Sequence, residues 1–206
     1  MPYLSPSPST GNMKKRAIFV DRDGTLNEEV GYITEMSQFR LFDFAAESIK
    51  MINDAGWYAV LITNQAGIAR GRYSEEFLRR LHAQMELSLS RDGARLDAIY
   101  YCPHHPEFGD PPYRQDCNCR KPRPGLIEKA AKEFSLDLNS CYIIGDRISD
   151  IETGHTAGTR SVMVMTGYGR EEYRDAIRQR PPDHAADNLL AAVRWIFSER
   201  KQNGQE

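Results

Sequence analysis

The sequence has few cysteines, no long apolar run and almost no net charge, and each shortage argues against a class of protein. Four of its 206 residues are cysteine, and three of these fall within residues 102–119, which does not fit a disulfide-stapled secreted scaffold. No apolar run approaches the roughly 20 residues that a membrane-spanning helix needs. The net charge of −2 favours neither nucleic acid nor an anionic membrane. We therefore expect a cytoplasmic protein that binds neither partner, and its small size and high polarity make a monomer the default.

The composition predicts one domain with a short tail at each end. With 40% hydrophobic residues, the chain can bury one sizeable core. Residues 1–13 are rich in Ser, Pro, Thr and Gly and lack the apolar stretch of a secretory signal, so we expect a disordered tail there. The domain would span residues 14–200, and residues 201–206 would be flexible.

Apolar, β-rich runs alternate with amphipathic segments, and this alternation is typical of an α/β protein. We expect a Rossmann-like, mostly parallel sheet with helices on both faces and no internal repeat. The expected strands span residues 17–20, 57–63, 96–101, 141–145 and 161–165. The expected helices span residues 44–55, a segment that begins at Ser74, 124–134, 149–157 and most of 186–200, where Leu190, Val193 and Phe197 would face inward.

Polar side chains follow the expected strands at their carboxyl ends, where ligands of open α/β sheets bind. Asp21 and Asp23 follow the first strand. Thr63 ends the second strand and Asp146 follows the fourth. Lys121 ends the long loop after the third strand. We expect these five side chains to converge on one rim of the sheet.

The acidic residues of this rim suggest a metal ion. Asp21 and Asp23 lie two residues apart, so an extended chain would point both one way and Arg22 the other. Close carboxylates repel each other unless a cation lies between them. A lone pair of this kind is more simply a capped turn at the end of a strand. Asp146 supplies a third carboxylate, which makes Mg²⁺ the favoured interpretation.

These residue types can carry out phosphoryl transfer. A carboxylate beside such a cation can attack phosphorus and form an acyl phosphate. The second carboxylate, Asp23, would protonate the leaving oxygen and later deprotonate the hydrolytic water. Thr63, together with Asn64, and Lys121 would provide the fixed donors that the phosphoryl group needs. Taken alone, Thr63 is a strand end and Lys121 a surface lysine, but the set predicts this chemistry.

Four segments resemble the four motifs of the haloacid dehalogenase-like (HAD-like) phosphatases, in the same order. They are DRDGT (21–25), TNQ (63–65), RKP (120–122) and GDRISD (145–150). Within that superfamily, FVDRDGTLN, EVGYI, TNQAGIARG, YYCPHHPE and CNCRKPRPG are similar to the heptose 1,7-bisphosphate phosphatases, in the branch related to histidinol-phosphate phosphatase. The resemblance implies a HAD-like fold and Mg²⁺-dependent hydrolysis of the C7 phosphate of a small sugar bisphosphate. The reaction would pass through an aspartyl phosphate and serve nucleotide-activated heptose biosynthesis.

The resemblance also implies a role for each matching residue. Asp21 would be the nucleophile and Asp23 the acid/base. Mg²⁺ would be held by Asp21, Asp146 and the backbone carbonyl of Asp23, and Thr63 and Lys121 would stabilise the phosphoryl group. The implied substrate contacts are Glu29, Val30, Gly31, Tyr32, Thr63, Asn64, Gln65, Ala66 and Arg120.

Two residues after the fourth strand lie outside this set. Asp150 would orient water or Lys121. Arg147 stands where relatives commonly carry Lys, which changes the outer shell of the metal site.

The loop after the third strand carries four soft metal ligands. Cys102, His104, Cys117 and Cys119 follow the spacing C-x-H-x12-C-x-C, and one imidazole with three thiolates completes a tetrahedral set for Zn²⁺. A closed set leaves no position for substrate, which favours a structural zinc. The ion would fix Cys119 and so aim Arg120 and Lys121 into the site. Free cysteines in a flexible loop are the plainer alternative.

The remaining cysteine and histidines are expected to play no part in the chemistry. Cys141 opens an apolar strand and is most simply a buried thiol. His105 would be a bystander in the zinc loop. For His82, His155 and His184, a surface or packing role outweighs a catalytic one.

The spacing of the motifs leaves no room for a cap domain. Only 39 residues separate Asp23 from Thr63, and a helix and strand occupy most of them. Loops must therefore roof the site: residues 27–35, residues 65–73 and the zinc loop. Arg70 and Arg72 make the second loop basic, and they would meet a distal phosphate or form a solvated turn.

Three other functions compete with this interpretation. Histidinol-phosphate phosphatases carry a similar but shorter zinc loop, so the long spacer and EVGY favour the heptose enzymes. A polynucleotide 3′-phosphatase would need a basic strand-binding surface. A zinc-bearing interaction module would not need the acidic rim. The anomer at C1 and the oligomeric state stay open.

Overall fold

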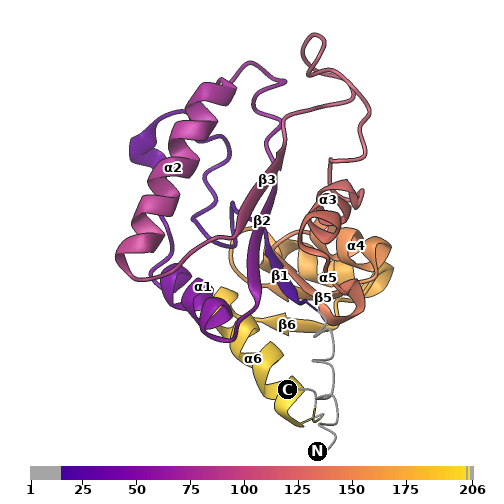
Figure 1. Ribbon diagram of the computed structural model, residues 1–206. Coiled ribbons are helices and arrows are strands. Elements are labelled where there is room, and N and C mark those ends of the chain that lie inside the picture. Colours follow the sequence, from indigo (N-terminus) through magenta and orange to yellow (C-terminus); the bar gives the residue numbers. More distant parts are fainter. Residues whose placement is uncertain (1–14, 203, 205–206) are drawn as a thin grey trace, which may run out of the picture.

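In the computed structural model, which describes residues 15–202 and 204, six parallel strands form one central sheet in the order β3-β2-β1-β4-β5-β6 (Figure 1). The strands are β1 Ala17–Val20, β2 Tyr58–Asn64, β3 Ala98–Cys102, β4 Tyr142–Gly145, β5 Arg160–Val164 and β6 His184–Ala186. This is the doubly wound order, in which β2 and β3 are added on one side of β1 and β4, β5 and β6 on the other, so the strand order reverses between β1 and β4. The expected Rossmann-like parallel sheet is confirmed.

Helices cover both faces of the sheet (Figure 1). One face carries α1 (Ala45–Asp54), α2 (Glu75–Arg91) and α6 (Leu189–Gln202). The other carries α3 (Gly125–Phe134), α4 (Ile148–Ala157) and α5 (Gly169–Gln179). Two short 3-10 helices, η1 (Met36–Gln38) and η2 (Leu138–Ser140), complete the described elements.

The central strand β1 explains why the apolar runs in this sequence are continuous. Ile18 and Val20 point into the core beneath α1, α2 and α6, whereas Ala17 and Phe19 point into the core beneath α3. All four residues are fully buried. A strand covered on both faces needs apolar side chains at every position, so a run such as AIFV is read as a buried strand.

Helix α2 begins and packs as its sequence predicts. The Ser74 side chain accepts a hydrogen bond from the Phe77 N–H at 3.1 Å and caps the helix. Leu81, Met85 and Leu89 then recur along one buried face. This helix also carries His82, whose side chain is buried.

Two elements near the C-terminus were not predicted. Helix α5 is rich in charged residues, and its buried residues are Gly169 and Ala176, so it offers few apolar side chains by which a helix can be recognised. Strand β6 is only three residues long. In α6 the buried face is Leu189, Ala192, Val193, Ile196 and Arg200, so only Val193 of the three residues expected to face inward is fully buried.

No separate domain is inserted into the described stretch between β1 and β2, which holds η1 and α1. The disordered tail expected at residues 1–13 lies outside the described residues. Lys201 and Gln202, from the expected flexible end, form the last turn of α6.

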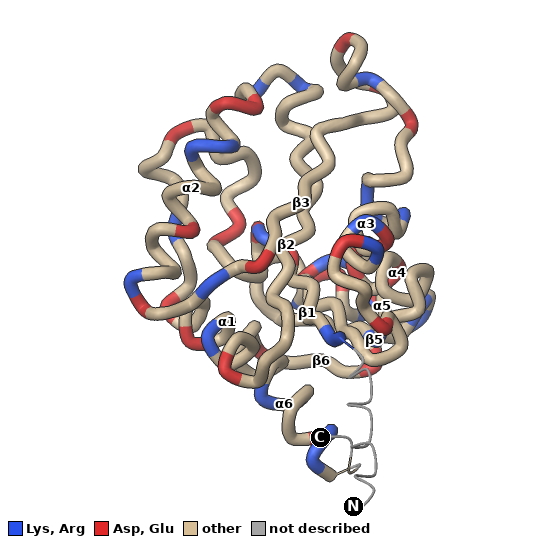
Figure 2. The backbone as a smooth tube through the Cα atoms, viewed as in Figure 1, with Lys and Arg blue, Asp and Glu red and all other residues tan. Residues whose placement is uncertain are grey.

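Among the described helices, none has the length and hydropathy needed to cross a membrane. Acidic and basic residues intermingle over the view in Figure 2.

Candidate active site

The reversal point of the sheet brings two strand ends together. Val20 of β1 pairs with Ile144 of β4, and the Asp21 N–H continues the ladder by donating to the Ile144 carbonyl at 2.9 Å. Asp21 and Asp146 therefore leave adjacent strands side by side. With Asp150 from the first turn of α4, they place one carboxylate oxygen each within 4.8 Å of the others.

Lys121 reaches this group from the loop after β3. Its Nζ lies 2.6 Å from Asp21 Oδ1 and 2.5 Å from Asp150 Oδ1, and it also donates to the Ile62 carbonyl at 3.2 Å. Only 5% of Lys121 is exposed. The alternative that Lys121 is an ordinary surface lysine is therefore excluded. Burial would lower the pKa of Lys121, but the carboxylates of Asp150 and Asp21 raise it overall, and the ammonium stays charged.

The group carries more negative charge than the protein neutralises. Three carboxylates face one ammonium, which leaves two uncompensated negative charges when all are ionised. Burial raises the pKa of Asp21 to about 7 and that of Asp146 to about 8, and the neighbouring carboxylates add to both shifts. Asp146 Oδ1 is buried and has no hydrogen-bond partner in the part of the chain that the structure describes. A hard divalent cation fits this donor set, because it needs oxygen ligands and would balance the charge.

Two glycines keep the other side of Asp146 free of side chains. Gly24 and Gly167 both have positive φ, at 80° and 52°. A Cβ atom would lie 2.2 Å from Asp146 Oδ2 at Gly24 and 2.1 Å at Gly167. Asp146 Oδ2 instead accepts a hydrogen bond from the Tyr168 N–H at 2.8 Å. The carboxylate is thus held by its Oδ2, and Oδ1 is left for another ligand.

The side chain of Asp23 turns away from the acidic group and toward Arg22. Arg22 Nη2 donates to both Asp23 oxygens, at 2.8 and 3.0 Å, and Arg22 Nε donates at 3.1 Å. Asn27 and Gln65 donate to the same carboxylate at 3.1 and 3.0 Å. Burial would raise the pKa of Asp23, but the Arg22 guanidinium outweighs it and lowers the pKa below its ordinary value. Arg22 would point away from both carboxylates only in an extended chain, and here the chain turns immediately after β1, as Gly24 and Thr25 indicate.

The loop that carries Lys121 is fastened to the end of β2. Asn64 Nδ2 donates to the Lys121 carbonyl at 3.1 Å, and the Lys121 N–H donates back to Asn64 Oδ1 at 3.0 Å. On the neighbouring residue, Thr63 Oγ1 accepts a hydrogen bond from Gln65 Nε2 at 2.8 Å. The second and third motifs are therefore held in register by direct side-chain contacts.

These groups open into a pocket of about 440 Å³. Eleven of the residues singled out from the sequence line it: Asp21, Asp23, Glu29, Gly31, Tyr32, Thr63, Asn64, Gln65, Ala66, Arg120 and Lys121. Val30 does not line it and is 47% exposed, and Asp146 is fully buried beneath it. Burial raises the pKa of Glu29 above its ordinary value.

Four further residues line the pocket that motif reasoning did not assign to it: Arg22, Tyr73, Ser149 and Tyr168. Arg147 also lines it, with its guanidinium 3.8 Å from the centre of the Tyr168 ring. Arg147, which stands where relatives commonly carry Lys, is therefore part of the pocket wall. No short motif marks Tyr73 or Tyr168, which the loops bring to the pocket.

The four soft ligands of the long loop converge as their spacing predicts. Cys117 Sγ lies 3.5 Å from Cys102 Sγ and 3.2 Å from Cys119 Sγ. His104 Nδ1 lies 3.3 Å from Cys119 Sγ and 3.8 Å from Cys102 Sγ. Tetrahedral zinc with bonds of about 2.3 Å to sulfur separates its sulfur ligands by about 3.8 Å. All four cysteines of the chain are free, so the cluster fits Zn²⁺ and not a disulfide.

The thiols of this cluster differ in acidity. Hydrogen bonding from the Cys102 thiol, and then from Cys117 and His104, lowers the pKa of Cys119 to about 5. The same bond, together with burial, raises the pKa of Cys102. Cys119 is thus the most acidic thiol of the three, and it immediately precedes Arg120.

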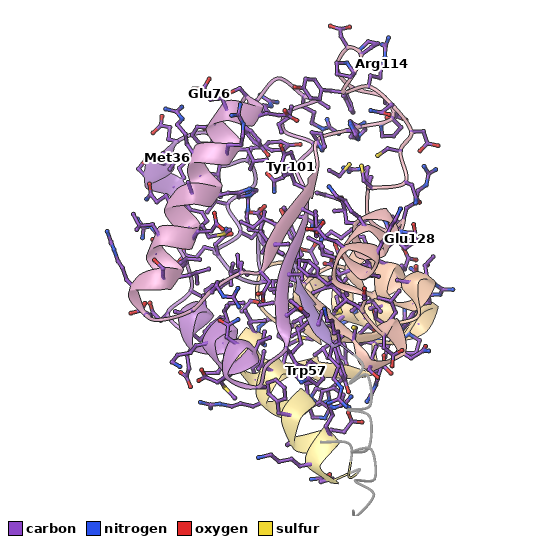
Figure 3. The ribbon with its side chains drawn as sticks, viewed as in Figure 1. Met36, Trp57, Glu76, Tyr101, Arg114 and Glu128 are labelled. Carbon is purple, nitrogen blue, oxygen red and sulfur yellow. The ribbon has the colours of Figure 1, made fainter. Side chains whose placement is uncertain are left out.

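The rest of the long loop extends away from the pocket. Figure 3 shows Arg114 at its far end, well beyond Tyr101 of β3. Arg70 packs its guanidinium 3.7 Å from the centre of the Phe108 ring and lies 3.1 Å from His105 Nε2. Arg70 and Arg72 line a second cavity with this loop tip and do not line the first pocket.

Comparison with known proteins finds the same families that the four motifs indicate. Residues 118–192 match the family model described as HAD-hydrolase-like. A D-glycero-beta-D-manno-heptose-1,7-bisphosphate 7-phosphatase of Pasteurella multocida (strain Pm70) is 46% identical over 154 residues, covering 74% of this chain and 83% of that protein. A D-glycero-D-manno-heptose-1,7-bisphosphate 7-phosphatase of Thermosynechococcus vestitus is 39% identical over 189 residues, covering 89% and 96%.

A solved structure is similar over nearly the whole domain. It is the crystal structure of D,D-heptose 1,7-bisphosphate phosphatase from B. bronchiseptica, complexed with magnesium and phosphate. The TM-score is 0.79 at 29% sequence identity, and the match covers 90% of this chain and 99% of that one. The HAD-like fold expected from the four motifs is confirmed.

Proposed function

The chain belongs to the heptose-1,7-bisphosphate 7-phosphatase family of HAD-like hydrolases, and on that premise we propose that it removes the C7 phosphate of D-glycero-D-manno-heptose 1,7-bisphosphate. One observation carries the proposal. Asp21 lies at the bottom of the pocket, 2.6 Å from a buried lysine and beside the open oxygen of Asp146. This is the arrangement that an attacking carboxylate needs: a fixed cation on one side and space for a second on the other.

The first half of the reaction transfers the phosphoryl group to the protein. An Asp21 oxygen forms a bond to phosphorus while the bond between phosphorus and O7 of the sugar breaks. Asp23 must carry a proton at this step, which burial favours and Arg22 opposes, and it gives that proton to O7, which leaves as an alcohol. Lys121 and the Thr63 hydroxyl lie where they can meet the charge on the transferring oxygens.

The second half returns the protein to its starting state. Asp23, now ionised, removes a proton from water as that water attacks phosphorus. The bond between phosphorus and Asp21 breaks, and inorganic phosphate leaves. The guanidinium of Arg22 favours the ionised form of Asp23 that this half-reaction requires.

Mg²⁺ would be held by Asp21, Asp146 and the backbone carbonyl of Asp23. When bound, it would offset the negative charge of the carboxylates and of the phosphoryl oxygens. The two uncompensated charges of the acidic group and the unpartnered Asp146 Oδ1 support this assignment.

Zn²⁺ would be held by Cys102, His104, Cys117 and Cys119, with no position left for substrate. Its role would be to fix the loop, because Arg120 follows directly after Cys119 and lines the pocket. Arg120 Nη1 also donates to the His104 carbonyl at 3.4 Å, which ties the guanidinium to the cluster.

Substrate size and charge match the pocket. A cavity of about 440 Å³ holds a small sugar phosphate, and Arg120 and Arg147 offer it two guanidinium groups besides Lys121. Glu29, Gly31 and Tyr32 form a further wall that can meet sugar hydroxyls. The product would enter nucleotide-activated heptose biosynthesis. The free cysteines fit a reducing compartment, and we place the reaction in the cytoplasm of a monomeric enzyme.

A substrate panel tests this function. Phosphate release would be measured with Mg²⁺ on heptose 1,7-bisphosphate, histidinol phosphate and a 3′-phosphorylated oligonucleotide. The proposal expects the bisphosphate to be hydrolysed with a kcat/KM at least about a hundredfold above either rival, a gap of some 2.7 kcal/mol in transition-state binding. Preference for histidinol phosphate or the oligonucleotide would overturn it.

A further inference from the structure

A buried histidine on α2 contacts the guanidinium that holds Asp23. His82 is 5% exposed, and its Nε2 lies 3.1 Å from Arg22 Nη1. Arginine has donors and no acceptor, so His82 Nε2 must accept this hydrogen bond. The ring proton then lies on Nδ1 and the imidazole is neutral. Burial, with Arg22 beside it, lowers the pKa of His82 to about 3, in keeping with a neutral ring.

The contact is the first of a series of hydrogen bonds that leads from His82 through Arg22 to Asp23, the proposed acid/base. Arg22 is 2% exposed and makes three hydrogen bonds to Asp23. Its Nη2 also donates to Gln65 Oε1 at 3.1 Å. Nη1 is the guanidinium nitrogen that makes no bond to Asp23, and His82 is the acceptor that it meets. Without it, a buried N–H would lose its partner and Arg22 would gain room to turn.

His82 itself stays away from the chemistry. It does not line the pocket, and it stands on a helix whose other buried residues pack into the apolar core. Its ring meets the edge of Tyr101 at a centroid distance of 5.9 Å, which fixes the imidazole from the other side. A packing role alone would not require a nitrogen aimed at Arg22.

We propose that His82 is a positioning residue for the reaction, which holds Asp23 in place through Arg22. The inference rests on the proposed function, because it needs Asp23 to be the acid that protonates the leaving oxygen. A displaced acid penalises a poor leaving group such as a sugar alkoxide. It leaves p-nitrophenolate nearly unaffected, because that group departs without a proton.

The test compares leaving groups in the full-length protein. For His82→Leu, kcat/KM on heptose 1,7-bisphosphate should fall about ten- to a hundredfold, whereas kcat/KM on p-nitrophenyl phosphate should fall threefold at most. kcat/KM is the right quantity because it covers the steps up to leaving-group departure. His82→Gln, whose Oε1 can accept from Arg22, should recover most of the loss. Equal losses on both substrates, or no rescue by glutamine, would overturn the proposal.

A control on the same helix tests whether a general loosening of α2 explains the loss in His82→Leu. Met85 is fully buried on α2, one turn beyond His82. Met85→Ala should lower thermal stability at least as much as His82→Leu, while the ratio of the two kcat/KM values stays at the parent level. A changed ratio in Met85→Ala would show that any loosening of α2 suffices, and His82 would have no special part.

One measurement separates this inference from the function on which it rests. In ¹⁵N spectra of the metal-loaded protein, His82 should show a pyridine-type Nε2 and a protonated Nδ1 at neutral pH. A protonated Nε2 would contradict the inference whatever the substrate. If the parent fails on the bisphosphate, the proposed function falls, and a hexose 6-phosphate then serves as the alkyl ester in the same comparison.

Discussion

The acidic rim and the thiol loop both gather candidate metal ligands, but they do so by different means. Asp21 and Asp146 leave adjacent strands whose backbones are hydrogen-bonded, and both are buried. In the thiol loop, Cys102 ends β3, but Cys117 and Cys119 come from an irregular segment and are only half-buried. The sheet positions the first set of ligands, whereas the second set depends on the ligand atoms themselves.

This difference separates what each ion would contribute. Without Mg²⁺ the rim would keep its shape, because the sheet and Lys121 hold it, and only the chemistry would be lost. Without Zn²⁺ the loop would lose the bonds that fix it, and both stability and substrate binding would suffer. The predictions below test the two halves of this comparison, from the largest effect to the smallest.

The largest effect is expected at the rim. Asp21→Asn removes the attacking oxygen and should lower turnover by about a thousandfold or more, with the fold and zinc content intact. Asp116→Asn is the matched control, because Asp116 is an exposed carboxylate paired with Arg123. Residual Asp21→Asn activity within tenfold of the parent would remove Asp21 as nucleophile.

Arg120 joins the two regions and should show the next largest effect. Arg120→Ala should cost about 2–4 kcal/mol in kcat/KM on the bisphosphate, because a charged partner of the distal phosphate or of the sugar hydroxyls is lost. The loss on p-nitrophenyl phosphate should be much smaller. Arg123→Ala is the control, since Arg123 is exposed on the same loop. Equal losses on both substrates would show that Arg120 serves the reacting phosphoryl group.

The thiol loop should respond in stability first. Cys117→Ser should release the one zinc ion expected per chain and lower the melting temperature, by about 2–4 °C for each kcal/mol of stability lost. Activity should fall by about tenfold, because Arg120 and Lys121 lose their anchor. Cys141→Ser is the control, because Cys141 is a buried thiol that accepts a hydrogen bond from the Ala17 N–H at the start of β1. This variant should keep its zinc. Zinc-free protein with the parent's activity and melting temperature would refute the structural role.

The smallest effect concerns pH and the rim. In the metal-free protein the pKa values of Asp21 and Asp146 are raised to about 7 and about 8. Because these values exceed those of the unfolded chain, the folded state holds the protons more tightly, and the stability they give is lost as pH rises through about 7 to 8. Mg²⁺ replaces those protons, so it should raise the melting temperature more at about pH 8.5 than at about pH 5.5. An equal rise at both would contradict the assignment.

The sequence predicted the positions of the rim because strand ends are easily recognised and parallel strands share one edge. Asp21, Thr63 and Asp146 needed only the strand order to be brought together, whereas Lys121 arrives on a loop that Asn64 fastens to β2. The thiol loop was predicted from spacing alone, because its ligands lie within 18 residues of the chain. In both cases the information was local or followed from regular structure.

What could not be predicted depends on side-chain directions and on distant contacts. Arg22 holds Asp23, a contact that strand alternation does not predict because β1 ends at Val20, before both residues. His82 meets Arg22 from 60 residues away, and its helix pattern reads as ordinary core. Helix α5 carries few apolar residues among many charged ones, and β6 is only three residues long.

The most direct test of the account follows the two phosphates of the proposed substrate separately. ³¹P NMR of heptose 1,7-bisphosphate with the Mg²⁺-loaded protein should show the C7 phosphate signal replaced by inorganic phosphate, while the C1 phosphate signal persists. The Asp21→Asn protein should leave both signals unchanged. Loss of the C1 phosphate first, or hydrolysis by Asp21→Asn at the parent's rate, would contradict the central claim.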